Sequence, residues 1–150
     1  MSHSTPGPDH PDLAHASGRP PEGVTVVRQQ EHGLVVRKVA PVGGERRLER
    51  EVTLLRHLEG LAVPVPLGPE PPPGIGERFG YAGSRTLHDA AVLDASVLVA
   101  SLAAIATVLA DAHDRGVSHG RVGPGHVLVG DSGRTVLTGW ADAGVREDVE

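Results

Sequence analysis

The sequence predicts an α+β fold, in which a small antiparallel sheet with one helix is joined to a second half built around a longer helix. Three observations predict it. Two β-branched segments flank a polar turn within residues 24–39, apolar residues recur at helical spacing within 94–115, and two further β-branched segments flank a Gly-containing turn within 127–138. Phe, Tyr and Trp occur once each, so Val, Leu and Ala must supply most of the core.

The chain has the size of one domain, and residues 1–22 differ in composition from the rest. They are rich in Pro, Gly, Ser and His, so we expect a disordered tail at 1–22 and a folded domain at 23–150. Nothing in the tail resembles a targeting signal. The absence of Cys suits a cytoplasmic protein, and the net charge of −5 argues against nucleic acid or an anionic membrane as a partner. The longest uncharged stretch, 95–110, is shorter than the roughly 20 residues of a membrane-spanning helix.

Local patterns predict the elements of the first half in chain order. Residues 24–28 and 34–39 form a β-hairpin, and residues 45–58 form an amphipathic helix that Gly60 is placed to end. Residues 61–76 contain six Pro, which limits regular structure there to short extended pieces. A short strand at 77–81 and a turn at Gly83-Ser84 follow.

The helix at 94–115 is the clearest element of the second half. Asp94 is predicted to be its N-cap, and Gly116 lies where a glycine ends a helix. Because the helix is apolar around most of its circumference, we expect it to run through a core. Residues 127–129 and 135–138 then form a second hairpin around the turn 130–133. The apolar residues at helical spacing are Leu98, Leu102, Ile105, Leu109 and Ala112.

Lys38 and Glu51 are the first candidate site residues. Lys38 is the single Lys among 14 basic Lys and Arg residues, and it lies on a predicted strand. Glu51 falls on the apolar face of the 45–58 helix, together with Leu48 and Leu55. A half-buried carboxylate needs a cation, so we predict that Lys38 pairs with Glu51. Taken singly, each residue also fits a structural explanation, with Lys38 at a strand edge and Glu51 reaching water from the edge of the stripe.

In this arrangement the chain resembles the protein kinase superfamily, of the bacterial serine/threonine kinase type. Val36-Arg-Lys38 followed by Arg50-Glu51-x-x-Leu54-Leu55 resembles the N-lobe, where a strand Lys pairs with a helix Glu and steadies nucleotide phosphates. Tyr81-Ala-Gly83 followed by Thr86-Leu87 resembles the hinge. The stretch 111–129, Asp-Ala-His-x-x-Gly-Val-x-His-Gly-Arg-Val-Gly-Pro-Gly-His-Val-Leu-Val, resembles the end of the αE helix and the catalytic loop. The resemblance implies an N-lobe with one αC-like helix at 23–82, a truncated helical C-lobe with a β-hairpin at 83–150, and ATP as a candidate ligand of Lys38 and Glu51.

The same register implies that the catalytic groups of a kinase are missing. In terms of H-R-D-L-K-P-E-N, His119 is kept, but Arg121 stands at the position of the base Asp and His126 at that of the metal-binding Asn. Gly139 replaces the metal-binding Asp of D-F-G, and Trp140 fills the slot of its Phe. Arg cannot accept a proton, and an imidazole and a glycine offer Mg²⁺ no carboxylate. No G-x-G-x-x-G precedes Lys38. We therefore expect neither a catalytic residue nor a bound metal ion.

Three alternatives for individual residues stay open. Asp131 or Asp142 could act as a displaced metal ligand, although each is equally explained as a turn or solvated residue. Arg121 could bind an anion without chemistry, against the simpler explanation that it faces water. His113 could form a metal site with His119 and His126, but the spacing fits no standard zinc pattern, and the kinase register explains His113 and His119 as packing residues.

These observations predict a pseudokinase, that is, a non-catalytic regulatory or scaffolding module with ATP binding as an option. One alternative is an atypical ATP-dependent phosphotransferase with displaced metal ligands. The other is a decayed kinase fragment that acts only within an assembly. The chain stops soon after the Gly139-Trp140-Ala141 triplet, so the 94–115 helix should lack part of its cover and expose an apolar patch. We expect another protein, or a second copy of the chain, to bury that patch.

Overall fold

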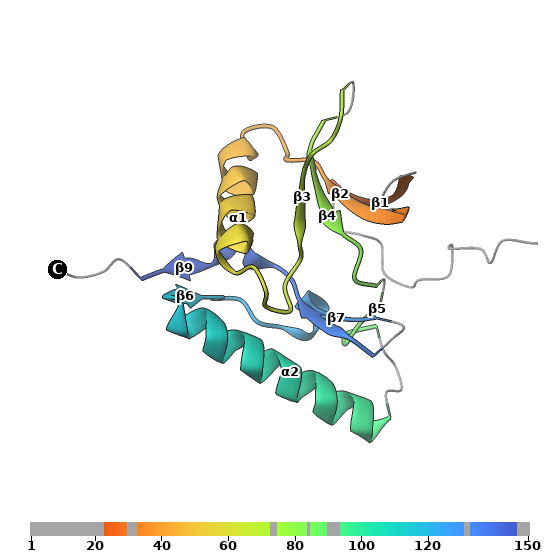
Figure 1. Ribbon diagram of the computed structural model, residues 1–150, viewed down its shortest axis with the longest axis vertical. Coiled ribbons are helices and arrows are strands. Elements are labelled where there is room, and N and C mark those ends of the chain that lie inside the picture. The colour runs from red at the N-terminus through yellow and green to blue at the C-terminus, as the bar shows by residue number, and fades with distance from the viewer. Residues whose placement is uncertain are drawn as a thin grey trace, which may run out of the picture.

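The computed structural model describes residues 23–29, 33–72, 75–83, 85–89, 94–130 and 133–146. Within those ranges the chain is a mixed α+β protein with antiparallel sheets and two α-helices (Figure 1). The expected tail at 1–22, the turn residue Ser84 and Asp131 lie outside the described residues. The elements are, in chain order, β1 (Val24–Gln29), β2 (Gly33–Lys38), α1 (Glu45–His57), β3 (Pro66–Pro69), β4 (Glu77–Gly80), β5 (Arg85–Thr86), α2 (Ala95–Asp114), β6 (Val117–Ser118), η2 (Pro124–His126), β7 (Val127–Val129), β8 (Thr135–Leu137), η3 (Trp140–Asp142) and β9 (Gly144–Val145).

The first half is a four-stranded antiparallel sheet in the order β1-β2-β4-β3. The predicted hairpin is confirmed, with β1 and β2 paired from Val24 opposite Lys38 to Gln29 opposite Gly33. The Pro-rich segment contributes only the short edge strand β3, whose register shifts between Pro66 and Gly68. A proline cannot donate to the ladder, which explains why this segment lies at an edge rather than inside the sheet.

Helix α1 lies beside this sheet and faces the centre of the molecule (Figure 1). Its buried residues are Leu48, Glu51, Val52, Leu54 and Leu55, so the amphipathic pattern is confirmed and the carboxylate lies on the buried face. The helix begins with Glu45 and has Arg56 in its last turn, which places each of these two charges at the end of the helix dipole that favours it.

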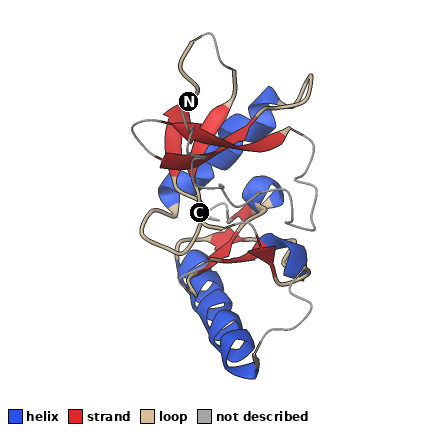
Figure 2. Cartoon of the chain, turned by 90° about the vertical axis from the view of Figure 1, so that its right-hand side faces the viewer, coloured by secondary structure: helices blue, strands red, loops and turns tan. Residues whose placement is uncertain are grey.

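The second half combines α2 with two small antiparallel sheets (Figure 2). One sheet has the order β5-β7-β8 and contains the predicted hairpin, and the other pairs β6 with β9. The predicted caps of α2 are confirmed. The carboxylate of Asp94 accepts the backbone N–H of Ser96, and Gly116 has a φ of +76° immediately after the helix end.

The expectation that α2 runs through a core is wrong. Its buried residues are Ser101, Ile105, Val108 and Ala112, which form one narrow stripe at spacings of four, three and four residues. Leu98 and Leu102, both expected inside, are 41% and 55% exposed. The stripe faces β8 at Ser101, whose hydroxyl accepts a hydrogen bond from the Thr135 hydroxyl over 3.1 Å, and its other three residues belong to the apolar core.

The exposed side of α2 agrees with the predicted apolar patch. Leu98, Val99 and Leu102 are its large exposed members. By length and composition α2 would also be able to cross a membrane, and 22% of the qualifying window is buried in the fold. Core helices of soluble proteins can have the same length and composition.

A single apolar cluster joins the two halves. It includes Leu55 of α1, Phe79 of β4, Ile105 of α2 and Trp140 of η3. Trp140 is 1% exposed and its indole N–H donates to the Leu137 carbonyl over 2.8 Å, so it fills the apolar position predicted for it. The sheet with α1 and the region around α2 are therefore packed on one common core.

Candidate functional site

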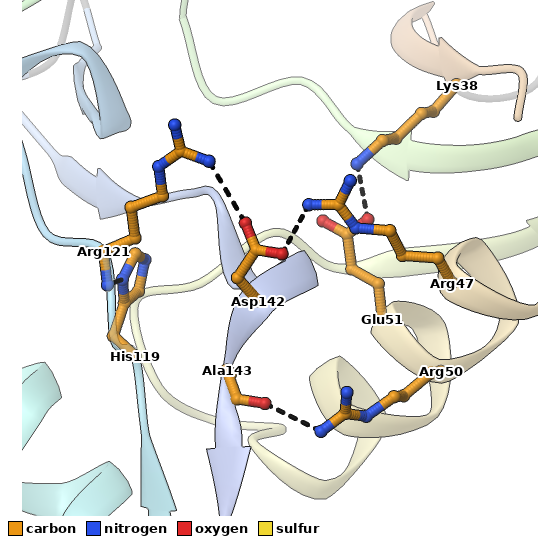
Figure 3. A network of polar contacts seen from close by, with 8 residues as sticks. All are labelled: Lys38, Arg47, Arg50, Glu51, His119, Arg121, Asp142 and Ala143. Carbon is orange, nitrogen blue, oxygen red and sulfur yellow. Dashed lines mark hydrogen bonds and ion pairs between the residues drawn. The ribbon is translucent and has the colours of Figure 1, made fainter. Parts of the chain in front are cut away.

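The predicted ion pair between Lys38 and Glu51 is present (Figure 3). Lys38 is the last residue of β2, and Glu51 lies in the second turn of α1. The Glu51 side chain is 8% exposed, whereas the Lys38 side chain is 32% exposed. The pair thus ties the sheet to the helix, and its ammonium group lies at the boundary between the core and solvent.

A second carboxylate, that of Glu77, lies opposite Lys38 in the sheet. It was not predicted from the sequence. The Glu77 Cα is the partner of the Lys38 Cα across β4 and β2, so the two side chains leave the same face of the sheet. Its Oε2 atom is buried and has no hydrogen-bond partner among the described residues. Lys38 is therefore paired with a carboxylate on α1 and stands opposite a second carboxylate, Glu77, on β4.

His119 is fixed by hydrogen bonds at both ring nitrogens. Its Nε2 donates to the Thr138 carbonyl over 2.7 Å, and its Nδ1 accepts the backbone N–H of Arg121 over 3.1 Å. The ring is 1% exposed and packs edge-on against Trp140 with centroids 4.6 Å apart. Burial lowers the pKa of His119, because the interior disfavours the charged form. His119 is a neutral packing residue, as predicted, but His113 is exposed on α2 and the packing role expected of it is wrong.

His126 fills the space beside Gly139. Its Nδ1 donates to the Arg121 carbonyl over 2.8 Å, and its own carbonyl accepts both the backbone N–H and the hydroxyl of Thr138. Gly139 has a φ of +81°, and a Cβ atom built there would lie 2.8 Å from the His126 ring. Two features therefore disfavour a side chain at position 139. The left-handed backbone conformation strains any residue other than glycine, and the His126 imidazole occupies the space of a Cβ atom.

A second charged group links α1 to the loop before η2 (Figure 3). It consists of Arg47, Arg121 and Asp142, and both arginines form ion pairs with Asp142. The Arg47 guanidinium is 2.5 Å from one oxygen of Asp142, and the Arg121 guanidinium is 3.3 Å from the other. The Arg50 guanidinium donates to the Ala143 carbonyl over 2.9 Å. Two arginines of α1 thus hold the segment that follows Gly139.

The Asp142 carboxyl is held in its charged form. Partial desolvation raises its pKa, but the hydrogen bond from Arg121 and the charge and hydrogen bond of Arg47 outweigh that effect, and the pKa lies below its usual value. Asp142 is therefore solvent-exposed, as one of its two explanations held, and is also paired with two arginines. Of the residues in this group, sequence reasoning missed Arg47, although its i, i+4 spacing to Glu51 on α1 could have indicated that both face the same side.

The described residues contain no group of three or more His, Cys, Asp or Glu side chains that could hold a metal ion. His119 and His126 do lie close, with ring centroids 5.9 Å apart, but both ring nitrogens of His119 and the Nδ1 of His126 are engaged by backbone groups. Both oxygens of Asp142 are engaged by arginines. The arrangement supplies cations and fixed imidazoles rather than a ligand set for Mg²⁺.

An open pocket of about 240 Å³ lies elsewhere, between the end of α2 and the β6–β9 pair. His113, Ser118 and Arg146 are among its lining residues, and neither Lys38 nor Asp142 is. The charged site around Lys38 and the pocket at the end of α2 are therefore separate features.

No protein-family model matches the chain, and no curated protein matches it either.

Proposed function

We propose that the chain is a protein kinase-like pseudokinase, a regulatory or scaffolding module that does not transfer phosphate. The observation that carries the proposal is the Lys38–Glu51 ion pair, formed between a strand and the following helix as the resemblance implies. A single Lys directed onto a buried helix carboxylate is the part of the kinase site that positions nucleotide phosphates.

The order of elements in the second half adds support. Helix α2 is followed by the loop with His119 and Arg121, then by the β7–β8 hairpin, and then by the Gly139–Asp142 segment. Hydrogen bonds from Arg47 and Arg50 bring this last segment against α1, the helix that carries Glu51. The loop, the triplet and the ion pair are therefore neighbours, as a kinase-like cleft requires.

The lost chemistry argues against catalysis. Arg121 cannot act as a base, and His126 occupies the space into which a carboxylate at 139 would have to project. Neither His126 nor Gly139 offers a carboxylate to hold a metal ion against the charge that develops on a transferring phosphoryl group, and such electrostatic compensation is usually the largest catalytic contribution. Asp142, one of the two candidates for a displaced metal ligand, has each oxygen bound to an arginine. Among the residues that the structure describes, none at this site favours the atypical phosphotransferase.

ATP is the nucleotide that we expect to bind, through the partly exposed ammonium of Lys38 and without Mg²⁺. The test is a thermal-shift titration with ATP, with and without Mg²⁺, on the wild type, Lys38→Met and Arg37→Gln. Arg37 is the matched control, because it precedes Lys38 on β2 and its side chain leaves the opposite face of the sheet. We expect ATP to raise the melting temperature equally with and without Mg²⁺, in the wild type and Arg37→Gln but not in Lys38→Met.

A phosphotransfer assay with labelled ATP, on the chain itself and on a generic protein substrate, completes the test. The proposal predicts no transfer above the level of Lys38→Met. Transfer that requires Mg²⁺ and is abolished by Lys38→Met would overturn it in favour of the phosphotransferase.

A further inference from the structure

We propose that Arg47 and Arg121 form a binding site for a phosphate monoester dianion, and that Asp142 occupies this site as an internal substitute when no ligand is bound. The inference goes beyond the proposed function and does not rest on it, because it uses neither Lys38 nor the resemblance to kinases.

The geometry of the three residues is that of a shared anion clamp. The two guanidinium groups come from different elements, α1 and the loop after β6, and each one holds a different oxygen of the same carboxylate. A guanidinium has five N–H donors in a planar fork, so most donors of the pair are left after one contact each. Arginine forks of this kind recognise phosphate as well as carboxylate.

The site is accessible to a ligand. The side chains of Arg47 and Arg121 are 58% and 71% exposed, and that of Asp142 is 42% exposed. Figure 3 shows both guanidinium groups directed toward the Asp142 carboxylate from opposite sides. An incoming anion can therefore reach the same donors without any rearrangement of the core.

The charge balance favours exchange of the internal carboxylate for a dianion. Two guanidinium groups carry a charge of about +2, of which Asp142 neutralises one unit, whereas a phosphate monoester carries close to −2 near neutral pH. The neighbouring Lys38 and Glu51 neutralise each other, and Arg50 is engaged by the Ala143 carbonyl. Displacement of the Asp142 side chain leaves the two arginines balanced by the ligand and removes a like charge from its vicinity.

The competing explanation is that the three residues only fasten α1 to the loop. The two explanations differ in the effect of Asp142→Asn. If Asp142 is an internal competitor, its removal strengthens phosphate binding, whereas a purely structural contact predicts lower stability and no gain in binding. Asn keeps the shape of the side chain while removing its charge, so the test does not depend on a cavity.

The experiment titrates the full chain with O-phosphoserine, with serine and with inorganic phosphate at low ionic strength, and follows the arginine Nε–H resonances by NMR. Low salt is required because exposed charges are screened. The variants are Arg47→Gln, Arg121→Gln and Asp142→Asn. Arg46→Gln is the matched control, because Arg46 is exposed on the same helix and lies outside the clamp. Circular dichroism of each variant establishes that it is folded.

We expect O-phosphoserine to bind with a dissociation constant on the order of 1 mM and serine not to bind. Loss of Arg47 or Arg121 should weaken binding about tenfold, Arg46→Gln should leave it unchanged, and Asp142→Asn should tighten it about threefold to tenfold. Equal weakening by Arg46→Gln, or no tightening by Asp142→Asn, would overturn the proposal.

A parallel titration with ATP separates the two sources of phosphate. If the phosphate of a nucleotide is bound only through Lys38, Lys38→Met abolishes ATP binding, Arg121→Gln leaves it intact and O-phosphoserine does not bind. That result overturns the arginine site and leaves the proposed function standing. The reverse result, in which O-phosphoserine binds through the arginines and ATP does not bind, supports this inference and removes nucleotide from the proposed function.

Discussion

At the scale of single residues, the Lys38–Glu51 pair is asymmetric, because its carboxylate is buried and its ammonium is partly exposed. We predict that Lys38→Met lowers the free energy of unfolding by about 2–3 kcal/mol, since it leaves Glu51 uncompensated in the core. Glu51→Gln should cost only about 1 kcal/mol, because Lys38 can turn its ammonium toward water. Urea denaturation of both variants near neutral pH measures the difference.

The double variant supplies the control for that comparison. Lys38→Met with Glu51→Gln should be more stable than Lys38→Met alone, since the charge of Glu51 is removed together with its partner. Equal losses in the two single variants would show that the carboxylate is not the buried partner.

His119 predicts how stability depends on pH. Its pKa is lowered in the folded chain by burial, so the unfolded chain binds the proton more readily. The contribution of His119 to stability is therefore complete above the unfolded pKa of about 6.5 and is lost as the pH falls from there through the folded pKa. Protonation would also place a second N–H against the backbone N–H of Arg121, which His119 now accepts. Denaturation of the wild type should accordingly require less urea at about pH 5.5 than at about pH 7.5.

His119→Gln isolates this effect, because an amide keeps a donor and an acceptor but does not titrate. The variant should be less stable than the wild type at the higher pH, and it should lose less further stability on acidification. Asp142 does not contribute to the difference between about pH 5.5 and pH 7.5, since its lowered pKa lies well below that range. An unchanged pH dependence in the variant would assign the effect to a group other than His119.

At the scale of elements, the two faces of α2 should respond differently to truncation. Ile105 is 6% exposed, whereas Leu102, three residues earlier, is 55% exposed. We predict that Ile105→Ala lowers the free energy of unfolding by about 2–4 kcal/mol and Leu102→Ala by less than about 1 kcal/mol. Thermal or urea denaturation of the two variants tests the orientation of the helix. A large loss in Leu102→Ala for the isolated chain would mean that this face is covered.

The same helix shows what the sequence could and could not predict. The first hairpin, α1 and both caps of α2 follow from neighbouring residues, and all were predicted. The buried face of α2 could not be predicted from neighbouring residues, because a helix that is apolar on nearly every side has no polar face that indicates which side meets solvent. Its orientation depends instead on contacts with distant segments, such as the hydrogen bond from Thr135, which lies 34 positions after Ser101 in the chain.

In the candidate site, too, the contact between neighbouring elements was predicted and the contact between distant segments was not. Lys38 and Glu51 are 13 residues apart, on adjacent elements, and an apolar stripe interrupted by one carboxylate was enough to predict their pairing. Arg47 and Asp142 are 95 residues apart, and no local pattern connects them. The contact exists because the segment after Gly139 packs against α1, which is a property of the tertiary structure.

At the scale of the whole molecule, the shared core predicts that both halves unfold together. The apolar cluster contains Leu55 and Phe79 from the first half and Ile105 and Trp140 from the second. Separation of the halves would expose this cluster and break the bonds of Arg47 and Arg50 to the segment after Gly139. We therefore predict a single cooperative transition.

Two probes test this prediction with different sensitivity to the two halves. Trp140 is the only Trp and is buried at the junction, so its fluorescence reports the shared core, whereas far-ultraviolet circular dichroism reports all helices and strands. The two unfolding curves should coincide in the wild type. Leu55→Ala, which truncates a residue of α1, should shift the fluorescence and circular dichroism midpoints by the same amount, because the lost packing destabilises one common core. A fluorescence transition that stays in place while the circular dichroism curve shifts would instead mean that the sheet with α1 unfolds independently of the region around α2.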